Sequence, residues 1–280
     1  MIKRLIHRLI LKKFRAPRIS HRRSPVDFGL EAEQVEIPAV DGGTLFGWWI
    51  TVAASTSTAP SPVAVVIHGW GANASLMLDM APWIKSIGFH ALYLDARCHG
   101  RSTDADFSSM PRFAEDLEAA RAWVLKRPDI DPERLFAIGH SVGAGAVLLS
   151  ASRTPWAGVV SLSAFAHPKD MMYRYMKEHR IPKKWIQPYL MAQVQKLIGA
   201  SFDDIAPEKT IQRVKCPIMI VHGIDDLDVP YHEAQRLMSH SPDARLCLLP
   251  GIGHDLRQAM DKLAPEVTDF LKHVPSQLHR

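Results

Sequence analysis

The run Gly-His-Ser-Val-Gly at 139–143 has the residue types and spacing of an activated nucleophile. It lies between an apolar stretch at 135–138 and a small-residue helical stretch at 144–152. A serine at a sharp strand-to-helix turn is held in a strained conformation that exposes its hydroxyl group. The flanking glycines leave out side chains where strand and helix would collide. The run predicts nucleophilic chemistry on Ser141; the plainer alternative is a glycine-rich turn with an idle serine.

An acid that could orient a catalytic base follows a later apolar run. Residues 217–221 read as a buried strand, and three aspartates come soon after it. The spacing from Gly223 favours Asp226, and Asp225 stays open as the alternative. Asp228 is expected in a turn or at a helix cap.

A histidine that could act as the base follows the last expected strand, 244–249. His254 lies on a glycine-rich loop there, from which an imidazole can reach the serine. The chain has 14 histidines, so position rather than residue type selects His254. Structural roles are expected for three other histidines, which are His99, His140 and His222.

Two backbone amides could bind a developing oxyanion. The β-branched run at 63–67 predicts a strand buried on both faces, and it ends in His-Gly-Trp-Gly. A turn at such a strand end can direct an amide at the reacting carbonyl oxygen. The expected donors are the amides of Trp70 and Val142, whereas the His68 side chain is expected to be a packed structural group.

These segments, together with Asp-Ala-Arg-Cys-His-Gly-Arg-Ser at 95–102, resemble the α/β-hydrolase superfamily. The 95–102 stretch is similar to the family's D-x-R-G-x-G-x-S loop, with Cys98 at the position of the usual glycine. The resemblance covers roughly residues 34–272 and is closest to small serine esterases and to lysophospholipase- or monoacylglycerol-lipase-like members. It implies an α/β-hydrolase fold, a mostly parallel twisted sheet with helices on both faces. By motif position it implies a catalytic triad of Ser141, Asp226 and His254.

The expected reaction is hydrolysis of a carboxylic ester through an acyl-enzyme, with no metal or organic cofactor required. The expected partner is a small-molecule ester. Two alternatives stay open at this point. The same triad could act on a thioester or an amide, or the chain could be a non-catalytic hydrolase-like binding protein, against which the complete Ser, Asp and His set argues.

Length and composition favour one large domain. At 280 residues with 47% hydrophobic residues, the chain can bury a full core, and we expect an α/β-hydrolase domain over 26–280. Residues 164–213 form an insertion too long for an ordinary loop, and a small helical cap is expected there. Its flexible and aromatic side chains predict an apolar substrate wall, formed by Met171, Met172, Tyr175 and Trp185.

The net charge of +5 is concentrated at the amino terminus. Residues 1–23 hold nine lysines and arginines and no acidic residue, so the rest of the chain is mildly acidic and a nucleic-acid-binding body is not expected. Within an arm at 1–25, residues 1–16 have the periodicity of a basic amphipathic helix. This pattern favours peripheral membrane contact, with an arm that packs on its own domain or stays disordered as the alternative. Three sparse cysteines without metal-ligand spacing fit a cytoplasmic location.

Further elements are expected around these motifs. Residues 34–52 predict an antiparallel hairpin that turns at an Asp-Gly-Gly sequence. Helices are expected over 73–87, over 111–126 and over a closing segment at 255–273.

Overall fold

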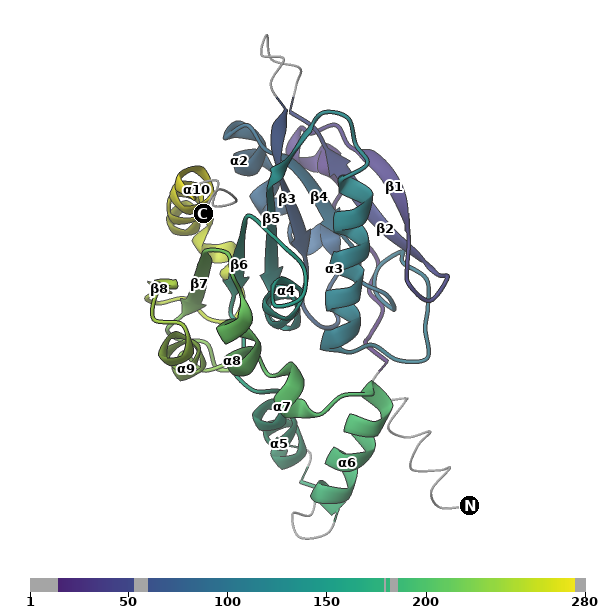
Figure 1. Cartoon of the computed structure of the whole chain (residues 1–280), viewed down its shortest axis with the longest axis vertical. Helices are drawn as coiled ribbons and strands as arrows, with labels where there is room; N and C mark the ends of the chain where they lie inside the picture. Colours follow the sequence, from purple (N-terminus) through teal and green to yellow (C-terminus); the bar gives the residue numbers. More distant parts are fainter. Residues whose placement is uncertain (1–14, 53–59, 179, 182–185, 275–280) are drawn as a thin grey trace.

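The computed structural model describes residues 15–52, 60–178, 180–181 and 186–274 (Figure 1). The strands are β1 (Glu33–Pro38), β2 (Thr44–Ile50), β3 (Ser61–Ile67), β4 (His90–Leu94), β5 (Ile130–His140), β6 (Gly158–Leu162), β7 (Ile218–Gly223) and β8 (Arg245–Leu249). The α-helices are α2 (Ala81–Ser86), α3 (Met110–Val124), α4 (Val142–Ala151), α5 (Pro168–Glu178), α6 (Ile186–Ile198), α7 (Phe202–Ile205), α8 (Pro207–Thr210), α9 (His232–His240) and α10 (Met260–His273). The 3-10 helices are η1 (Pro25–Phe28), η2 (Ala74–Leu76), η3 (Leu78–Met80), η4 (Ile211–Arg213) and η5 (Leu256–Ala259).

All eight strands form one sheet in the order β1-β2-β4-β3-β5-β6-β7-β8. Only the pairs β1–β2 and β2–β4 are antiparallel, and every other neighbouring pair is parallel. The expected hairpin at 34–52 is therefore β1 and β2, at one edge of the sheet. The arrangement confirms the predicted mostly parallel α/β architecture.

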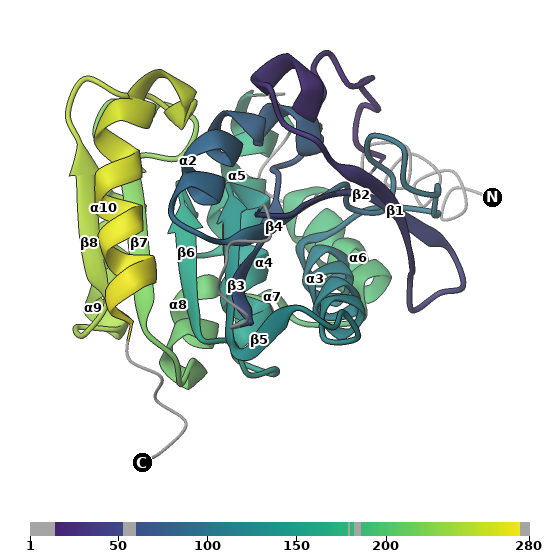
Figure 2. The same cartoon turned by 90° about the horizontal axis from the view of Figure 1, so that it is seen from above.

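The central strands are apolar along their length because both of their faces are buried. In β3, Val63, Val65 and Ile67 face the core that contains residues of α3 and α4. The intervening Ala64 and Val66 face a second core, which contains residues of α2 and α10. Helices on the two faces thus cover side chains that alternate along each strand, and Figure 2 shows these helices around the sheet.

Two of the expected helices differ in detail. The segment 73–87 is not one helix but η2, η3 and α2 in succession. The side chain of Asn73 accepts a hydrogen bond from the Ser75 amide and caps η2, and a proline stands in the first turn of α2. The closing segment begins as η5 and continues as α10 from Met260.

Helices α5, α6, α7 and α8 and then η4 occupy the chain between β6 and β7, where the cap insertion was expected. Figure 1 shows α5, α6 and α7 beyond one end of the sheet. The first of the apolar residues expected in this region, Met171, Met172 and Tyr175, lie in α5, whereas Trp185 lies outside the described residues.

Of the basic amino-terminal arm, residues 1–14 lie outside the described part of the chain, and the predicted amphipathic helix lies almost wholly among them. The segment that follows packs on the domain. Arg18 donates hydrogen bonds to the carbonyl oxygens of Gly100 and Ser102 at 2.7 and 2.8 Å. His21 Nε2 lies 2.8 Å from the buried Asp95 Oδ2. Within the described ranges, no helix has the length and apolar character needed to cross a bilayer.

Candidate active site

Ser141 stands at the turn between β5 and α4, where its backbone has φ 55° and ψ −115°. A positive φ is uncommon for a residue other than glycine, so the turn holds local strain. The glycines beside it are required by close packing. A Cβ on Gly139 would lie 2.2 Å from the Gly143 carbonyl oxygen, and one on Gly143 would lie 2.4 Å from the His68 carbonyl oxygen. The contact at Gly139 is the strand-to-helix collision that the spacing predicted, whereas at Gly143 the close neighbour is the segment after β3.

The loop after β3 lies against this turn because β3 and β5 are neighbours in the sheet. A Cβ on Gly69 would lie 3.1 Å from the Ser141 Cβ. Trp70 follows directly and is 36% exposed. Val142 is the first residue of α4, so its amide has no partner within the helix. The two amides expected to bind an oxyanion thus belong to segments that flank Ser141.

Two buried histidines hold the loop after β3. His68 Nε2 accepts a hydrogen bond from the Ala96 amide, so its Nδ1 carries the proton and donates to the Gly69 carbonyl oxygen at 2.7 Å. His99 Nε2 likewise accepts from the Gly71 amide at 3.1 Å. Burial lowers the pKa of His68 to about 3 and also lowers the pKa of His99. Both rings are therefore neutral, and the structural role expected for them is that of fixing this loop.

The loop after β7 holds a paired carboxylate. Asp226 is 3% exposed, and its Oδ2 lies 2.7 Å from His254 Nδ1. Its Oδ1 accepts hydrogen bonds from the amides of Asp228 and Val229 at 3.0 and 2.7 Å. Burial works against ionisation, but the hydrogen bonds from His254 and from the Val229 amide outweigh it and lower the pKa of Asp226. Asp225, the alternative acid, is exposed. Asp228 lies in the turn and does not cap α9, because the N-cap of that helix is Tyr231.

His254 follows β8 and is held on two sides. Besides the Asp226 contact of its Nδ1, its carbonyl oxygen lies 2.9 Å from His140 Nε2. The two imidazole rings stack obliquely, with centres 4.8 Å apart and planes at 51°. Because His140 directly precedes Ser141, this contact brings the loop of His254 to the nucleophile turn.

His140 and His222 contribute structure around the acid and base, through contacts that sequence reasoning did not predict. Burial first, and the neighbouring His254 second, lower the pKa of His140 to about 4. His222 Nε2 donates to the Val229 carbonyl oxygen at 2.7 Å and lies 3.5 Å from Asp226 Oδ2. Burial lowers the pKa of His222 as well. Neither ring is charged at neutral pH, so neither repels a proton that arrives on His254.

A cavity of about 340 Å³ opens beside Ser141. Its wall includes Trp70, Ser141 and Val142, together with Met171, Met172 and Tyr175 of the expected apolar wall. The sequence did not single out the rest of the lining, which is Ser109, Met110, Pro111, Phe165, Pro168, Val194, Ile198, Phe202 and Ile205. Most of these residues are apolar and belong to the start of α3 or to the helices between β6 and β7, which fold over the carboxyl ends of the strands.

Comparison with known proteins agrees with this geometry. Residues 58–208 match the family model described as serine aminopeptidase, S33. The chain belongs to this family. It is a serine-type hydrolase of the α/β-hydrolase superfamily, which confirms the resemblance and the fold predicted from the motifs. The YfhR protein of Escherichia coli O157:H7 is 29% identical over 229 residues, covering 80% of this chain and 73% of that protein.

Other similar proteins include named hydrolases. The lysophosphatidylserine lipase ABHD12 of Danio rerio is 27% identical over 195 residues, covering 63% of this chain and 46% of that protein. The esterase Pf2001 of Pyrococcus furiosus superposes with a TM-score of 0.72 at 22% identity, covering 92% of this chain and 96% of that one. Est1E of Butyrivibrio proteoclasticus, solved with ferulic acid bound, gives 0.67 at 19% identity, covering 85% and 98%. At these identities the two structures support the α/β-hydrolase fold alone.

In the loop after β4, this chain has Cys98 where the family pattern has a glycine. The backbone conformation shows why glycine is usual at this position. Cys98 has φ 66°, a conformation that glycine adopts without strain. Its sulfur accepts a hydrogen bond from the Ala105 amide at 3.3 Å. The buried thiol thereby stabilises a turn in which this α/β-hydrolase lacks the glycine.

Among the described residues, one group has the geometry of a metal-ligand set. Ligand atoms of Asp226, Asp228 and His254 lie within 4.8 Å of one another. Asp226 and His254 already form the 2.7 Å hydrogen bond with each other, and Asp228 is an exposed carboxylate in a turn. The group is explained as an acid–base pair with a neighbouring aspartate.

Proposed function

We propose that this α/β-hydrolase cleaves carboxylic esters with an apolar acyl or alkyl group through an acyl-enzyme on Ser141. The observation that carries the proposal is the 2.7 Å contact between His254 Nδ1 and Asp226 Oδ2, in a loop that also binds the residue before Ser141. An acid, a base and a half-buried serine that lines a cavity, all at the carboxyl ends of the strands, are the parts that acyl transfer requires.

His254 acts as the general base through Nε2. Because Nδ1 keeps its proton and donates a hydrogen bond to Asp226, Nε2 presents a lone pair to the Ser141 hydroxyl. As Oγ bonds to the carbonyl carbon, the hydroxyl proton moves to Nε2. The tetrahedral intermediate then expels the alkoxide, which takes this proton and leaves as the alcohol. A water molecule repeats the attack with the same base, and the carboxylic acid is released.

The surroundings of His254 favour its transient positive charge. Asp226 has a lowered pKa and is ionised at neutral pH, so it stabilises the imidazolium. The pKa of His140, about 4, leaves the adjacent ring uncharged. An ionised His140 with its centre 4.8 Å from that of His254 would oppose proton transfer.

The amides of Trp70 and Val142 bind the oxyanion in this proposal. The Trp70 amide belongs to the loop that His68 and His99 hold in place, and the Val142 amide is at the first residue of α4. Neither amide therefore has to reorganise as charge develops. Fixed donors of this kind supply about 3–4 kcal/mol each to the transition state of acyl transfer.

The cavity favours an apolar ester over an aminoacyl substrate. An aminopeptidase has to bind the α-ammonium group of its substrate, and a buried cation requires an anionic or polar partner. The described lining contains no aspartate or glutamate, and its polar side chains are two serines, a tyrosine and a tryptophan. An acyl or alkyl chain, in contrast, fits a wall of methionine, phenylalanine and aliphatic side chains.

The test is a substrate panel on the purified chain. It compares p-nitrophenyl esters of graded acyl length, an acyl thioester and aminoacyl p-nitroanilides, with a fluorophosphonate probe to report a reactive serine. We expect labelling of Ser141 and a preference for esters with acyl chains longer than acetyl. If Ser141 is labelled and the chain cleaves the anilides but not the esters, the enzyme is a peptidase and the proposed ester hydrolysis is wrong. An unlabelled protein would refute nucleophilic catalysis.

A further inference from the structure

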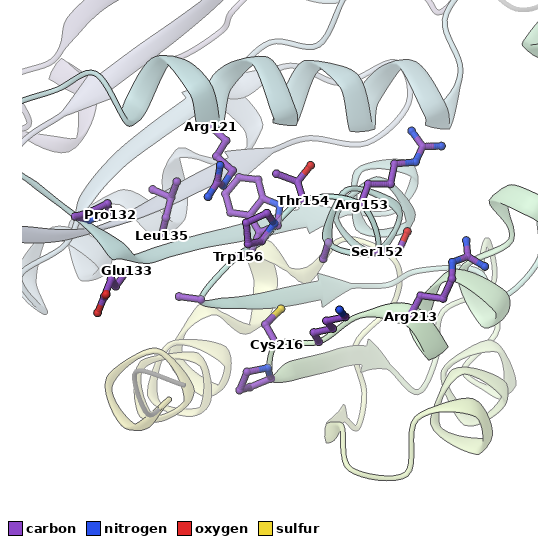
Figure 3. Close-up of a pocket in the computed structure, with 15 residues that line it drawn as sticks. Arg121, Pro132, Glu133, Leu135, Ser152, Arg153, Thr154, Trp156, Arg213 and Cys216 are labelled. Carbon is purple, nitrogen blue, oxygen red and sulfur yellow. The ribbon is translucent and has the colours of Figure 1, made fainter. Parts of the chain in front are cut away.

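A second cavity, of about 690 Å³, lies at the opposite end of the parallel strands from Ser141. Figure 3 shows the residues that line it. It is formed by Arg121 near the end of α3, residues 132–135 in the first half of β5, and the loop at 151–157 between α4 and β6. Residues 213–217, which precede β7, complete it. These segments meet at the amino ends of parallel strands, whereas Ser141 follows the carboxyl end of β5.

The side chains around this cavity carry an excess of positive charge. Arg121, Arg153, Arg213 and Lys215 line it, and Glu133 is the one carboxylate among its described lining residues. The formal excess is three positive charges. Across the described ranges, none of the four cationic side chains forms an ion pair. Arg213 makes a long 3.4 Å hydrogen bond to the Asp204 carbonyl oxygen. Glu118 acts electrostatically on Arg153, and counting it still leaves an excess of two.

Arg121 is the most enclosed of the four. Its guanidinium carbon lies 5.9 Å from the centre of the Trp156 ring, and Figure 3 shows the two side chains close together. Its buried Nε has no hydrogen-bond partner among the described residues. Burial lowers the pKa of Arg121, with no carboxylate to oppose this effect. A buried donor without a partner is destabilising, and an anionic ligand would supply the missing acceptor.

The floor of the cavity is apolar and fixed. Leu135 and Trp156 are 1% and 6% exposed, and the Trp156 indole donates a hydrogen bond to Ser150 Oγ at 3.1 Å. Pro155 and Pro217 add rigid apolar surface. The volume lies within the range of sites for small organic ligands, about 300–1,000 Å³.

We infer that this cavity binds an organic phosphate, with the phosphate groups among Arg121, Arg153, Arg213 and Lys215 and the organic part on the apolar floor. Guanidinium groups match the oxygens of a phosphate with paired hydrogen bonds. A monocarboxylate would neutralise only one of the three excess charges, whereas a phosphate ester carries two or more. A free inorganic phosphate would leave most of the volume and the apolar floor uncovered.

This site is separate from the one beside Ser141, and the inference does not rest on the proposed function. Helix α4 joins the two, since Ser141 precedes its first turn and the 151–157 loop follows its last. Its 10 residues span about 15 Å at 1.5 Å per residue. A ligand of the second cavity therefore does not compete directly with a substrate at the serine.

The test is calorimetric titration of the full chain with ATP, without divalent cations and at physiological ionic strength. Adenosine and inorganic phosphate are titrated in parallel. The double variant Arg153→Ala/Arg213→Ala alters two exposed residues and should weaken ATP binding at least tenfold. The matched control Lys126→Ala/Lys272→Ala removes two exposed charges outside the cavity and should keep the affinity within about twofold. Adenosine and inorganic phosphate should each bind at least tenfold more weakly than ATP.

Several results would overturn the inference. These are no binding of ATP, equal binding of adenosine or of inorganic phosphate, or equal weakening by the control variant. If Ser141→Ala lost ATP binding, ATP would be assigned to the cavity beside Ser141, and this result would also refute the inference. Thermal unfolding of each variant confirms that a lost signal does not come from a lost fold.

Discussion

His140 Nε2 lies 2.9 Å from the main-chain carbonyl oxygen of His254, so the residue before the nucleophile holds the loop that carries the base. The carbonyl can only accept, which makes His140 the donor and places its proton on Nε2. The contact joins segments 114 residues apart in sequence. The relative position of serine and imidazole thus depends on a side chain that takes no part in the chemistry.

We expect His140→Leu to lower kcat by up to about 100-fold, because misplacement of a catalytic group by about 1 Å costs that much. His140→Gln retains an N–H donor and should recover most of the activity. Steady-state kinetics on the preferred p-nitrophenyl ester measures both. If His140→Leu and His140→Gln are both as active as the parent chain, the hydrogen bond does not position His254.

Ser141→Ala and Ser141→Gly should both abolish turnover, but they should differ in stability. At φ 55° a non-glycine residue is strained by about 1–3 kcal/mol, and glycine relieves that strain. Glycine also costs about 0.5–1 kcal/mol in backbone entropy relative to alanine. We therefore expect the glycine variant to have the larger free energy of unfolding by about 1 kcal/mol, measured by urea denaturation. A less stable glycine variant would argue against strain at the turn.

Asp226→Asn should lower kcat by about 10⁴-fold, since a neutral amide no longer favours the productive histidine tautomer or stabilises the imidazolium. Asp225→Asn is the matched control, because Asp225 is the exposed neighbour. It should retain activity within about threefold. The opposite ranking in ester kinetics would assign the acid to Asp225.

Stability should fall on acidification because of the buried histidines. The pKa of His68 is lowered from 6.5 to about 3, so the unfolded chain binds this proton more readily than the folded one. The resulting stability is complete above pH 6.5 and is lost as the pH falls toward about 3, by up to roughly 5 kcal/mol for this group. Asp226, whose pKa is lowered, acts in the same direction at lower pH. Denaturant titrations at successive pH values test this, and a stability independent of pH over that interval would contradict it.

The sequence was sufficient wherever one local pattern determined the structure. The β-branched runs predicted β3 and β7 because a strand buried on both faces has to be apolar throughout. The elbow was predictable because only glycine fits at Gly139 and Gly143. Spacing also selected Asp226, which the structure places against His254.

Contacts between distant loops were not predictable. Nothing local indicates that His140 meets the His254 carbonyl, that His21 reaches Asp95, or that Met110 enters the cavity. The helix expected over 73–87 breaks into short pieces because the Asn73 cap and a proline compete with helix continuation. In each case the decisive partner is far away in sequence or depends on a side chain's own hydrogen bond, which periodicity does not encode.

The depth of the cavity should set the acyl length that the enzyme accepts. Met171 lies in its wall, on α5, and Met171→Trp adds bulk that an acyl chain would otherwise occupy. We expect kcat/KM for long-chain p-nitrophenyl esters to fall at least about tenfold while that for acetate changes less than about threefold, since a clash costs on the order of 1–3 kcal/mol. Tyr173→Trp is the matched control on the same helix, because Tyr173 is 38% exposed and does not line the cavity. If both substitutions shift the chain-length profile equally, the change comes from α5 as a whole, and the cavity is not where the acyl group binds.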